Sequence, residues 1–281
     1  ILQENRIMSA IRNGSVKKLL SEFKKISEGN PELYEKFITE YNRPLKEGLY
    51  SDYANRDTLL ELVRFYSSEK DGFVSLKEYK ERMPEGQKAI YYLTGGNKDV
   101  LKSSPLLGAY KKKGYEVLLM ADDIDEFVIS TVPTYEDLPL KAINKAGAME
   151  DIETEEDKAK AEGKKAVAEK IKKALEGKVK DVVVSTRLTD SPSAVVVDEN
   201  DPTVQTQRIL KSMGAQDLPE ILPILEINPD SPIVGKIEGS DDETLNKDLS
   251  IVLLDQALLQ EGLMPADPSE FAKTLTKLLS K

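Results

Sequence analysis

The segment Arg82–Gly96, RMPEGQKAIYYLTGG, holds the pattern that decides the fold. A turn at residues 84–86 leads into the apolar run Ala89–Leu93, which ends in Thr94-Gly95-Gly96 ahead of a new helix. A strand, a glycine pair and a helix in this order are typical of βα units and also open many phosphate-binding loops. The loop lacks the Lys-Ser/Thr ending of a P-loop and the spacing of a dinucleotide-binding loop. We therefore expect a tight βα turn, with nucleotide binding as the alternative.

Strands and helices alternate on either side of this segment. We expect further strands at 115–120 and 139–144, and helices at 75–83, 98–101, 104–114 and 124–131. This alternation predicts a parallel sheet with helices on both faces. In residues 2–66, apolar residues instead recur every three or four positions, with an interruption at Gly29-Asn30-Pro31. This pattern predicts three antiparallel helices in a small bundle.

The C-terminal half continues with a charge-rich stretch, 144–164, and an exposed helix that ends at Gly177. Two strands, 179–188 and 194–198, are joined by TDSPS, which has the turn chemistry of a hairpin. A helix at 203–213, a strand at 223–229 and two closing helices follow. We therefore expect a mixed α/β fold in three parts. These are a helical bundle (1–66), a small βαβ-type three-layer sandwich (67–143) and a mixed α/β C-terminal domain with a helical dimerisation bundle (144–281).

The composition excludes several kinds of site. The 281 residues include neither cysteine nor histidine, and the net charge is −10. The chain therefore has no thiolate nucleophile, thiolate zinc site or Ser-His-Asp arrangement, and an acidic chain is a poor partner for nucleic acid. We expect a cytoplasmic protein without a metal site, a membrane span or a nucleic-acid partner. The carboxylate clusters at 122–126 and 241–243 are interpreted as helix caps and solvated surface.

Two helices carry more apolar surface than a simple surface helix needs. The helix 244–261 is apolar on most sides and, with the last helix, predicts self-association through a four-helix bundle. Burial against the chain's own sheet is the alternative. The residues predicted at this interface are Leu249, Ile251, Val252, Leu253, Leu258, Leu259, Leu275 and Leu278. The helix 203–213 is amphipathic, which suits either an ordinary packed helix or an adaptable binding surface.

RMPEGQKAIYYLTGG resembles the Arg-Met-x-Glu-x-Gln-x-x-Ile-Tyr-Tyr-x-Thr-Gly signature of the heat-shock protein 90 family. In the same order, LKEG with DYANRDTLLELVRFYSS and LLGAYKKKGYEVLLMADDIDEF resemble the family's middle domain. VKDVVVSTRLTDSPSAVVV, LEINPDSPIV and LLDQALLQEG resemble its C-terminal domain. The resemblance covers essentially the whole chain. It implies a distal middle domain plus C-terminal domain fragment of the family's bacterial form.

What the resemblance implies is a stress-response chaperone, a homodimeric ATP-driven clamp that binds and remodels non-native client proteins. This part would supply dimerisation and part of the client surface. It would itself be no enzyme and hold no cofactor, with ATP and Mg bound in the parent's N-terminal domain. Other chaperones are implied partners. Helical-repeat co-chaperones are not, because the chain ends in LTKLLSK instead of Met-Glu-Glu-Val-Asp.

The family's client-contacting positions are matched in part. The client-binding residues that the resemblance implies are Phe127, Ile209, Leu210 and Met213. Phe127 replaces a tryptophan, and Pro202 and Thr206 stand where methionines are expected, which changes the shape of the client surface. Two other functions remain as alternatives: a nucleotide-dependent enzyme that uses Thr94-Gly95-Gly96, and a purely structural dimerisation module.

Overall fold

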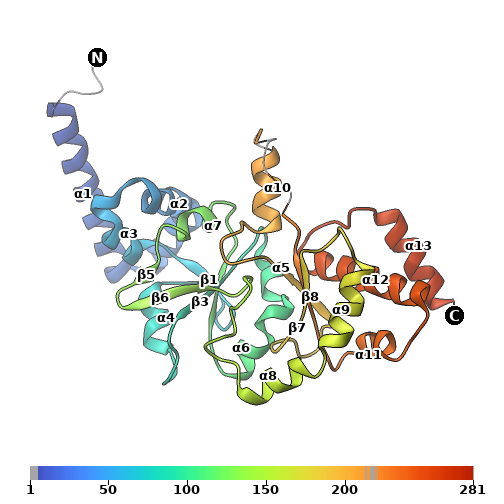
Figure 1. Cartoon of the computed structure of the whole chain (residues 1–281). Coiled ribbons are helices and arrows are strands. Elements are labelled where there is room, and N and C mark those ends of the chain that lie inside the picture. The colour runs from blue at the N-terminus through green and yellow to red at the C-terminus, as the bar shows by residue number, and fades with distance from the viewer. Residues whose placement is uncertain (1–5, 213, 216–218, 220, 281) are drawn as a thin grey trace.

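The computed structural model describes residues 6–212, 214–215, 219 and 221–280. Figure 1 shows a helical part, a first sheet with its helices, and a smaller second sheet whose helices run to the C-terminus. The mixed α/β fold expected from the sequence is thus confirmed. Within the described ranges, no helix combines the length and apolar character needed to cross a membrane.

The helical part is built as its sequence predicts. Among the described residues its helices are α1 (Arg6–Gly29), α2 (Pro31–Ser51), the 3-10 turn η2 (Tyr53–Asn55) and α3 (Arg56–Leu62). Asn30 caps α2, because its Oδ1 accepts a hydrogen bond from the Leu33 backbone N–H at 3.1 Å. Pro31 takes the first turn, where no intrahelical N–H bond is needed. α3 ends earlier than expected, because Phe65 already belongs to a strand of the first sheet.

The first sheet has the strand order β2-β1-β4-β3-β6-β5. Its strands are β1 (Phe65–Ser67), β2 (Phe73–Val74), β3 (Ile90–Thr94), β4 (Val117–Met120), β5 (Thr134–Tyr135) and β6 (Leu138–Ala142). The central strands β4, β3 and β6 are parallel, as predicted. The outer strands β1, β2 and β5 pair antiparallel. They were not predicted, because strands of two or three residues are too short to show a hydrophobic period.

The first sheet lies between two cores. Its helices are α4 (Leu76–Arg82), α5 (Lys98–Lys102), the 3-10 turn η3 (Pro105–Leu107), α6 (Gly108–Lys112) and α7 (Asp125–Ile129). Alternate residues of a strand point to opposite faces of a sheet. Ile90 of β3 accordingly packs with the helical part, whereas Tyr91 and Leu93 pack with α5, α6 and the second sheet.

The second sheet corrects one prediction. It consists of β7 (Asp181–Val184), β9 (Ile224–Ile227) and β8 (Ser193–Val196), in that spatial order. β9 is parallel to β7 and antiparallel to β8, so the predicted hairpin between β7 and β8 is wrong. The physical reason is that a local turn signal cannot exclude a third strand: the buried strand β9 inserts between β7 and the equally buried β8.

Six helices complete the described chain: α8 (Glu155–Glu162), α9 (Lys165–Ala174), α10 (Val204–Ser212), α11 (Pro232–Glu238), α12 (Glu243–Gln260) and α13 (Pro268–Leu279). α9, α11 and α12 cover one face of the second sheet and form a third core with it. The other face packs on the first sheet's part of the molecule. α10 is different, because it stands away from the body of the chain (Figure 1).

A buried ion pair in the second sheet's part of the chain also contacts the first sheet's part. The guanidinium of Arg187 contacts Glu226 twice, at 2.9 Å from Nε to Oε2 and 2.5 Å from Nη2 to Oε1. Its Nη1 also donates to the backbone oxygen of Ile143, just after β6. Burial by itself would lower the pKa of Arg187, but the Glu226 carboxylate raises it above its ordinary value. The charge on Arg187 is therefore retained inside the molecule.

Candidate functional site

The short helix α7 presents one aromatic side chain to solvent. Val128 and Ile129 are 5% and 4% exposed and pack in the core of the helical part, whereas Phe127 is 40% exposed. Successive residues of an α-helix point about 100° apart, so a helix that buries its neighbours turns Phe127 outward. The structure therefore gives Phe127 the exposure that a contact residue requires.

α7 is fixed to α2 by a buried ion pair. Lys46 of α2 is 2% exposed and lies 2.7 Å from Oδ1 of Asp125, which is 1% exposed, and 2.6 Å from Oδ2 of Asp122. Burial raises the pKa of Asp125 above its usual value, and the neighbouring Lys46 acts in the opposite direction. Arg43 of α2 pairs with Asp123 at 2.5 Å. The acidic cluster that we interpreted as helix caps thus binds cations of α2, with Asp125 also accepting the Asp122 backbone N–H at 3.0 Å.

Glu126, in the same helix, holds the start of α10. Its Oε1 accepts the backbone N–H of Thr203 at 2.9 Å, and its Oε2 accepts the Thr203 hydroxyl at 2.7 Å. The Thr206 hydroxyl donates to the same Oε2. Lys145 lies 3.3 Å from Oε1 and donates to the backbone oxygen of Asp201 at 2.5 Å. A carboxylate at a helix N-terminus is favoured by the unpaired N–H groups there and by the helix dipole.

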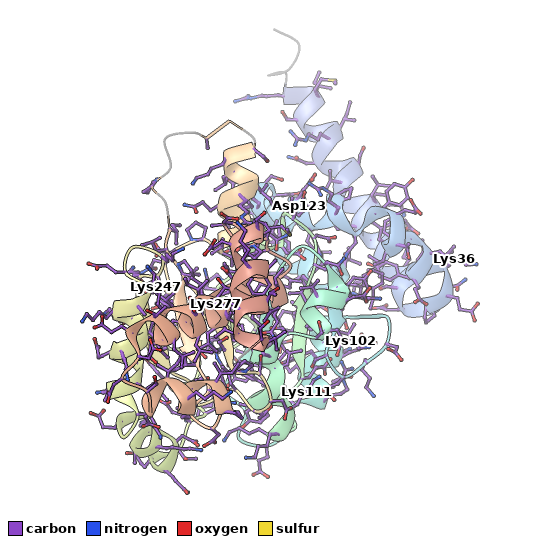
Figure 2. All side chains as sticks on the ribbon, turned by 90° about the vertical axis from the view of Figure 1, so that its right-hand side faces the viewer. Lys36, Lys102, Lys111, Asp123, Lys247 and Lys277 are labelled. Carbon is purple, nitrogen blue, oxygen red and sulfur yellow. The ribbon has the colours of Figure 1, made fainter. Side chains whose placement is uncertain are left out.

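The burial of α10 is the reverse of that of an ordinary packed helix. Its buried residues are polar, with Thr206 at 4% and Gln207 at 5% exposed. Its apolar residues Ile209 and Leu210 stay partly exposed. Ile209 lines a small hollow together with Asp123, which is labelled in Figure 2. Thr206 thus attaches α10 to Glu126 of α7, and Gln207 donates to the backbone oxygen of Pro219. Ile209 and Leu210, one turn further along the helix, stay partly exposed.

The glycine pair after β3 receives a side chain from α10. A Cβ on Gly95 would lie 2.6 Å from Leu101 Cδ2, and a Cβ on Gly96 would overlap the amide of Gln205. The loop joins β3 to α5, as the expected βα turn does. Neither glycine has a positive φ, so what the pair provides here is close approach by Leu101 and Gln205. Cavities of about 30 Å³ and 10 Å³ lie beside this loop. Ligand sites usually measure about 300 Å³ or more, so the nucleotide alternative has no room there.

The residues predicted for self-association fall into two groups by burial. The members of the chain's own third core are Leu249, Val252 and Leu253, at 7%, 6% and 0% exposed. The other members are partly or well exposed: Ile251, Leu258, Leu259, Leu275 and Leu278. For the first group, the alternative of burial against the chain's own sheet is correct. The second group lies where a partner can reach it.

α13 is fixed on α12 by an ion pair of 2.5 Å between Asp248 and Lys277, which is labelled in Figure 2. Met213 lies outside the described residues. Glu126 and Gln205 were missed, because polar contacts between distant segments leave no periodic signal in a sequence. The one available hint is Thr203, a good helix-capping residue at the predicted start of the helix.

Comparison with known proteins gives consistent matches over the whole chain. Residues 1–281 match the family model described as Hsp90 protein. Chaperone protein HtpG of Treponema denticola is 49% identical, and that of Borrelia garinii subsp. bavariensis is 47% identical, each over 100% of this chain and 45% of the relative. Chaperone protein HtpG of Wolinella succinogenes is 47% identical, with 46% of its length covered. The chain thus spans less than half the length of these curated relatives.

These matches do not sustain two of our expectations, and both are corrected. We expected the chain to be no enzyme and to hold no ATP or Mg, on the ground that the family's nucleotide-binding part lies outside it. The family model instead covers residues 1–281 in full, and the relatives match over 45% of their length. A match of this extent gives no ground for denying the chain the family's nucleotide chemistry, so the two expectations are withdrawn.

Proposed function

Because the chain belongs to the Hsp90 protein family, we propose that it acts in a molecular chaperone through two surfaces. Phe127, Ile209 and Leu210 form the client surface, which contacts non-native proteins. The exposed apolar residues of α12 and α13 form the self-association surface, which joins two copies. The partners of the chain in this proposal are a second copy of itself, non-native proteins and other chaperones. Its location is the cytoplasm.

The observation that carries the client surface is the reversed burial of α10. A helix that buries Thr206 and Gln207 while leaving Ile209 and Leu210 partly exposed forgoes the usual gain from apolar burial. Exposed apolar surface on a soluble protein commonly marks an interaction site. Non-native proteins expose apolar side chains, which such a surface can cover without demanding a fixed shape.

The position of Phe127 supports the same proposal. Glu126 binds α7 to α10, and Asp125 binds α7 to α2. The helix that carries the exposed Phe127 is therefore fixed to two other helices. An aromatic side chain supplies a large contact area and loses little conformational entropy on binding. The client surface is therefore partly organised before a client arrives, which lowers the entropic cost of binding.

The test is suppression of aggregation of a heat-denatured enzyme, followed by light scattering in the presence of the 281-residue chain. Phe127→Ala combined with Leu210→Ser is expected to weaken suppression, because it removes apolar contact area without opening the core. Leu33→Ser combined with Tyr50→Ala is the matched control, since these residues are 48% and 59% exposed on α2. Equal suppression by the two double variants would contradict the client surface.

The self-association surface rests on apolar side chains that the chain itself leaves open. Leu259 and Leu275 are 42% and 37% exposed, and Leu279 at the end of α13 is 80% exposed. Ile251, Leu258 and Leu278, on the same two helices, are partly packed against the third core and partly exposed. A two-fold related copy would cover the self-association surface with an identical patch, as in most homodimers.

We also propose that residues 1–281 correspond to the distal middle and C-terminal parts of the family's longer chain. The support is the order of the matching motifs along this sequence, from RMPEGQKAIYYLTGG to LLDQALLQEG. Peptide mapping of the native protein by mass spectrometry tests the placement. Peptides preceding Ile1 are expected, and together they should exceed the chain in length. A native protein that starts at or near Ile1 would contradict it.

A further inference from the structure

A groove lies along β7 and is also lined by residues of α8, α9, β8 and β9. We propose that this groove, the β7 groove, binds an extended polypeptide segment in which apolar side chains alternate with lysine or arginine. The proposal goes beyond the client surface and does not rest on it, because the two surfaces share no residue.

The shape of the groove suits an extended chain. Its volume is about 540 Å³, and Asp181–Arg187 line it along the whole length of β7. The segment Ala146–Glu150 forms one wall, and α8 and α9 contribute the other. A groove that follows the four residues of β7 and the three residues after it offers a linear site, unlike the compact pocket that a small ligand needs.

The backbone of β7 can pair with such a chain. β7 is an edge strand, and Ser185 donates its N–H inward, to the backbone oxygen of Ile227 at 2.8 Å. Because backbone groups alternate in direction along a strand, the N–H and C=O of Val184 point to the outer edge. The outward N–H of Val182 is taken by Oδ1 of Asp181 at 2.7 Å. An added strand would therefore bond at Val184, the mode of recognition known as strand addition.

The floor of the groove includes an apolar side chain that is exposed to solvent. Val183 is 37% exposed, although it lies in the middle of a strand and faces the same side of the sheet as Glu226. Met149, Ala161 and Ala168 also line the groove. In an extended peptide every second side chain points the same way, so alternate apolar side chains would meet this floor.

The charges around the groove favour basic partners. The carboxylates that line it are Glu150, Glu153, Glu162, Glu169, Asp181 and Glu226, and the cations are Lys158, Lys165 and Arg187. Each cation is already paired: Lys158 with Glu155, Lys165 with Glu162, and Arg187 with Glu226. Glu150 and Glu169 are exposed, and neither has an ion pair within the described part of the chain. Lysine or arginine side chains of a bound segment would complement them.

The experiment is fluorescence anisotropy of the 281-residue chain with a fluorescein-labelled peptide of alternating lysine and valine. Saturable binding is expected, weakened by salt, and about tenfold weaker for the peptide in which glutamate replaces lysine. Absence of saturation, or equal binding of the two peptides, would overturn the proposal.

Two variants locate the site. Val184→Pro removes the outward N–H and is tolerated on an edge strand, so binding should weaken about tenfold while the melting temperature changes little. Glu150→Lys combined with Glu169→Lys should abolish the preference for the basic peptide, whereas Glu28→Lys combined with Glu40→Lys, on the exposed helical part, should preserve it. If Val184→Pro unfolds the chain, the comparison between the two double lysine variants still tests the proposal. The same preference for the basic peptide in both double variants would overturn it.

A final control separates this site from the client surface. Phe127→Ala combined with Leu210→Ser should leave binding of the lysine-valine peptide unchanged, because neither residue lines the β7 groove. Loss of peptide binding in that variant would assign the peptide to the client surface and overturn the β7 groove.

Discussion

Glu126 is the residue on which the position of α10 depends. One carboxylate accepts hydrogen bonds from Thr203 and Thr206 and lies beside Lys145, while the next residue in the chain, Phe127, points to solvent. A single turn of α7 thus provides both a contact side chain and the support for its neighbour. The aromatic could be identified from the sequence, but the partners of the carboxylate lie 77 residues away, beyond the reach of any local pattern.

Glu126→Gln is expected to loosen α10 without unfolding the chain. The amide keeps the shape of the carboxylate but loses its charge, and charge-assisted hydrogen bonds contribute about 1.5–3 kcal/mol. Hydrogen exchange should therefore be about tenfold faster or more for the amides of α10, with the amides of β4 unchanged. Glu47→Gln, which alters an exposed pair with Arg43 on α2, is the control. Unchanged exchange in α10 would contradict this role of Glu126.

Glu261 gives the stability of the fold a dependence on pH. Burial raises its pKa from 4.5 to about 7, and the Ser104 hydroxyl at 3.3 Å and Arg187 offset this only in part. The folded chain therefore keeps this proton to a higher pH than the unfolded chain. The stabilisation is complete below pH 4.5 and is lost as the pH rises through about 7.

The glutamine in Glu261→Gln stays neutral at every pH, so this variant should not lose stability from this position as the pH rises. Between pH 5 and pH 8, the free energy of unfolding of the wild type should fall by about 2–3 kcal/mol relative to the variant. Urea unfolding at a series of pH values measures the difference. Parallel pH profiles for the two proteins would show that Glu261 is not the responsible group.

The helices and strands that could be predicted are those that a local sequence signal specifies. The start of α2 follows from Asn30-Pro31, and the parallel strands β3, β4 and β6 follow from the alternation of strands and helices. The β7–β8 hairpin failed because the turn signal between two strands says nothing about a third strand that inserts between them. β9 pairs with both β7 and β8, although it follows β8 by more than twenty residues in the chain.

α12 allows folding and self-association to be separated. Leu253 is fully buried in the third core, so Leu253→Asp should unfold the C-terminal part, since an unpaired charge in an apolar core costs several kcal/mol. Leu259→Asp combined with Leu275→Asp should preserve the circular dichroism spectrum and convert dimers to monomers in light scattering. A wild-type chain that is monomeric at all concentrations would contradict the self-association surface.

For the molecule as a whole, the two sheets form one packed body. The second core contains Tyr91 and Leu93 of the first sheet together with Val196 and Ile224 of the second. Arg187, which is buried and paired with Glu226 of β9, crosses the same boundary through its hydrogen bond to the backbone oxygen of Ile143. The contacts between these residues could not be predicted from the sequence. Their neighbours in the chain are ordinary strand residues, and they carry no signal that indicates contact with the other sheet.

Breaking this pair should destabilise both sheets together. Arg187→Ala or Glu226→Ala leaves the other charge buried and unpaired, at a cost of about 3–5 kcal/mol, whereas the double variant should cost less than the sum. Calorimetry of the three variants gives the coupling energy. Removal of the exposed pair Lys18 and Glu22 on α1 is the control and should leave the stability almost unchanged. Additive effects of the Arg187 and Glu226 variants would contradict the coupling.

Gly96 and Gln205 place a condition on each other. They come from segments more than a hundred positions apart in the chain, yet the amide of Gln205 occupies the space that any side chain at position 96 would need. A larger residue at 96 therefore requires the end of the Gln205 side chain to move aside or to be replaced by a smaller one, whereas position 205 can become smaller on its own. In sequences that share this arrangement, we expect larger residues at 96 mainly where 205 is small.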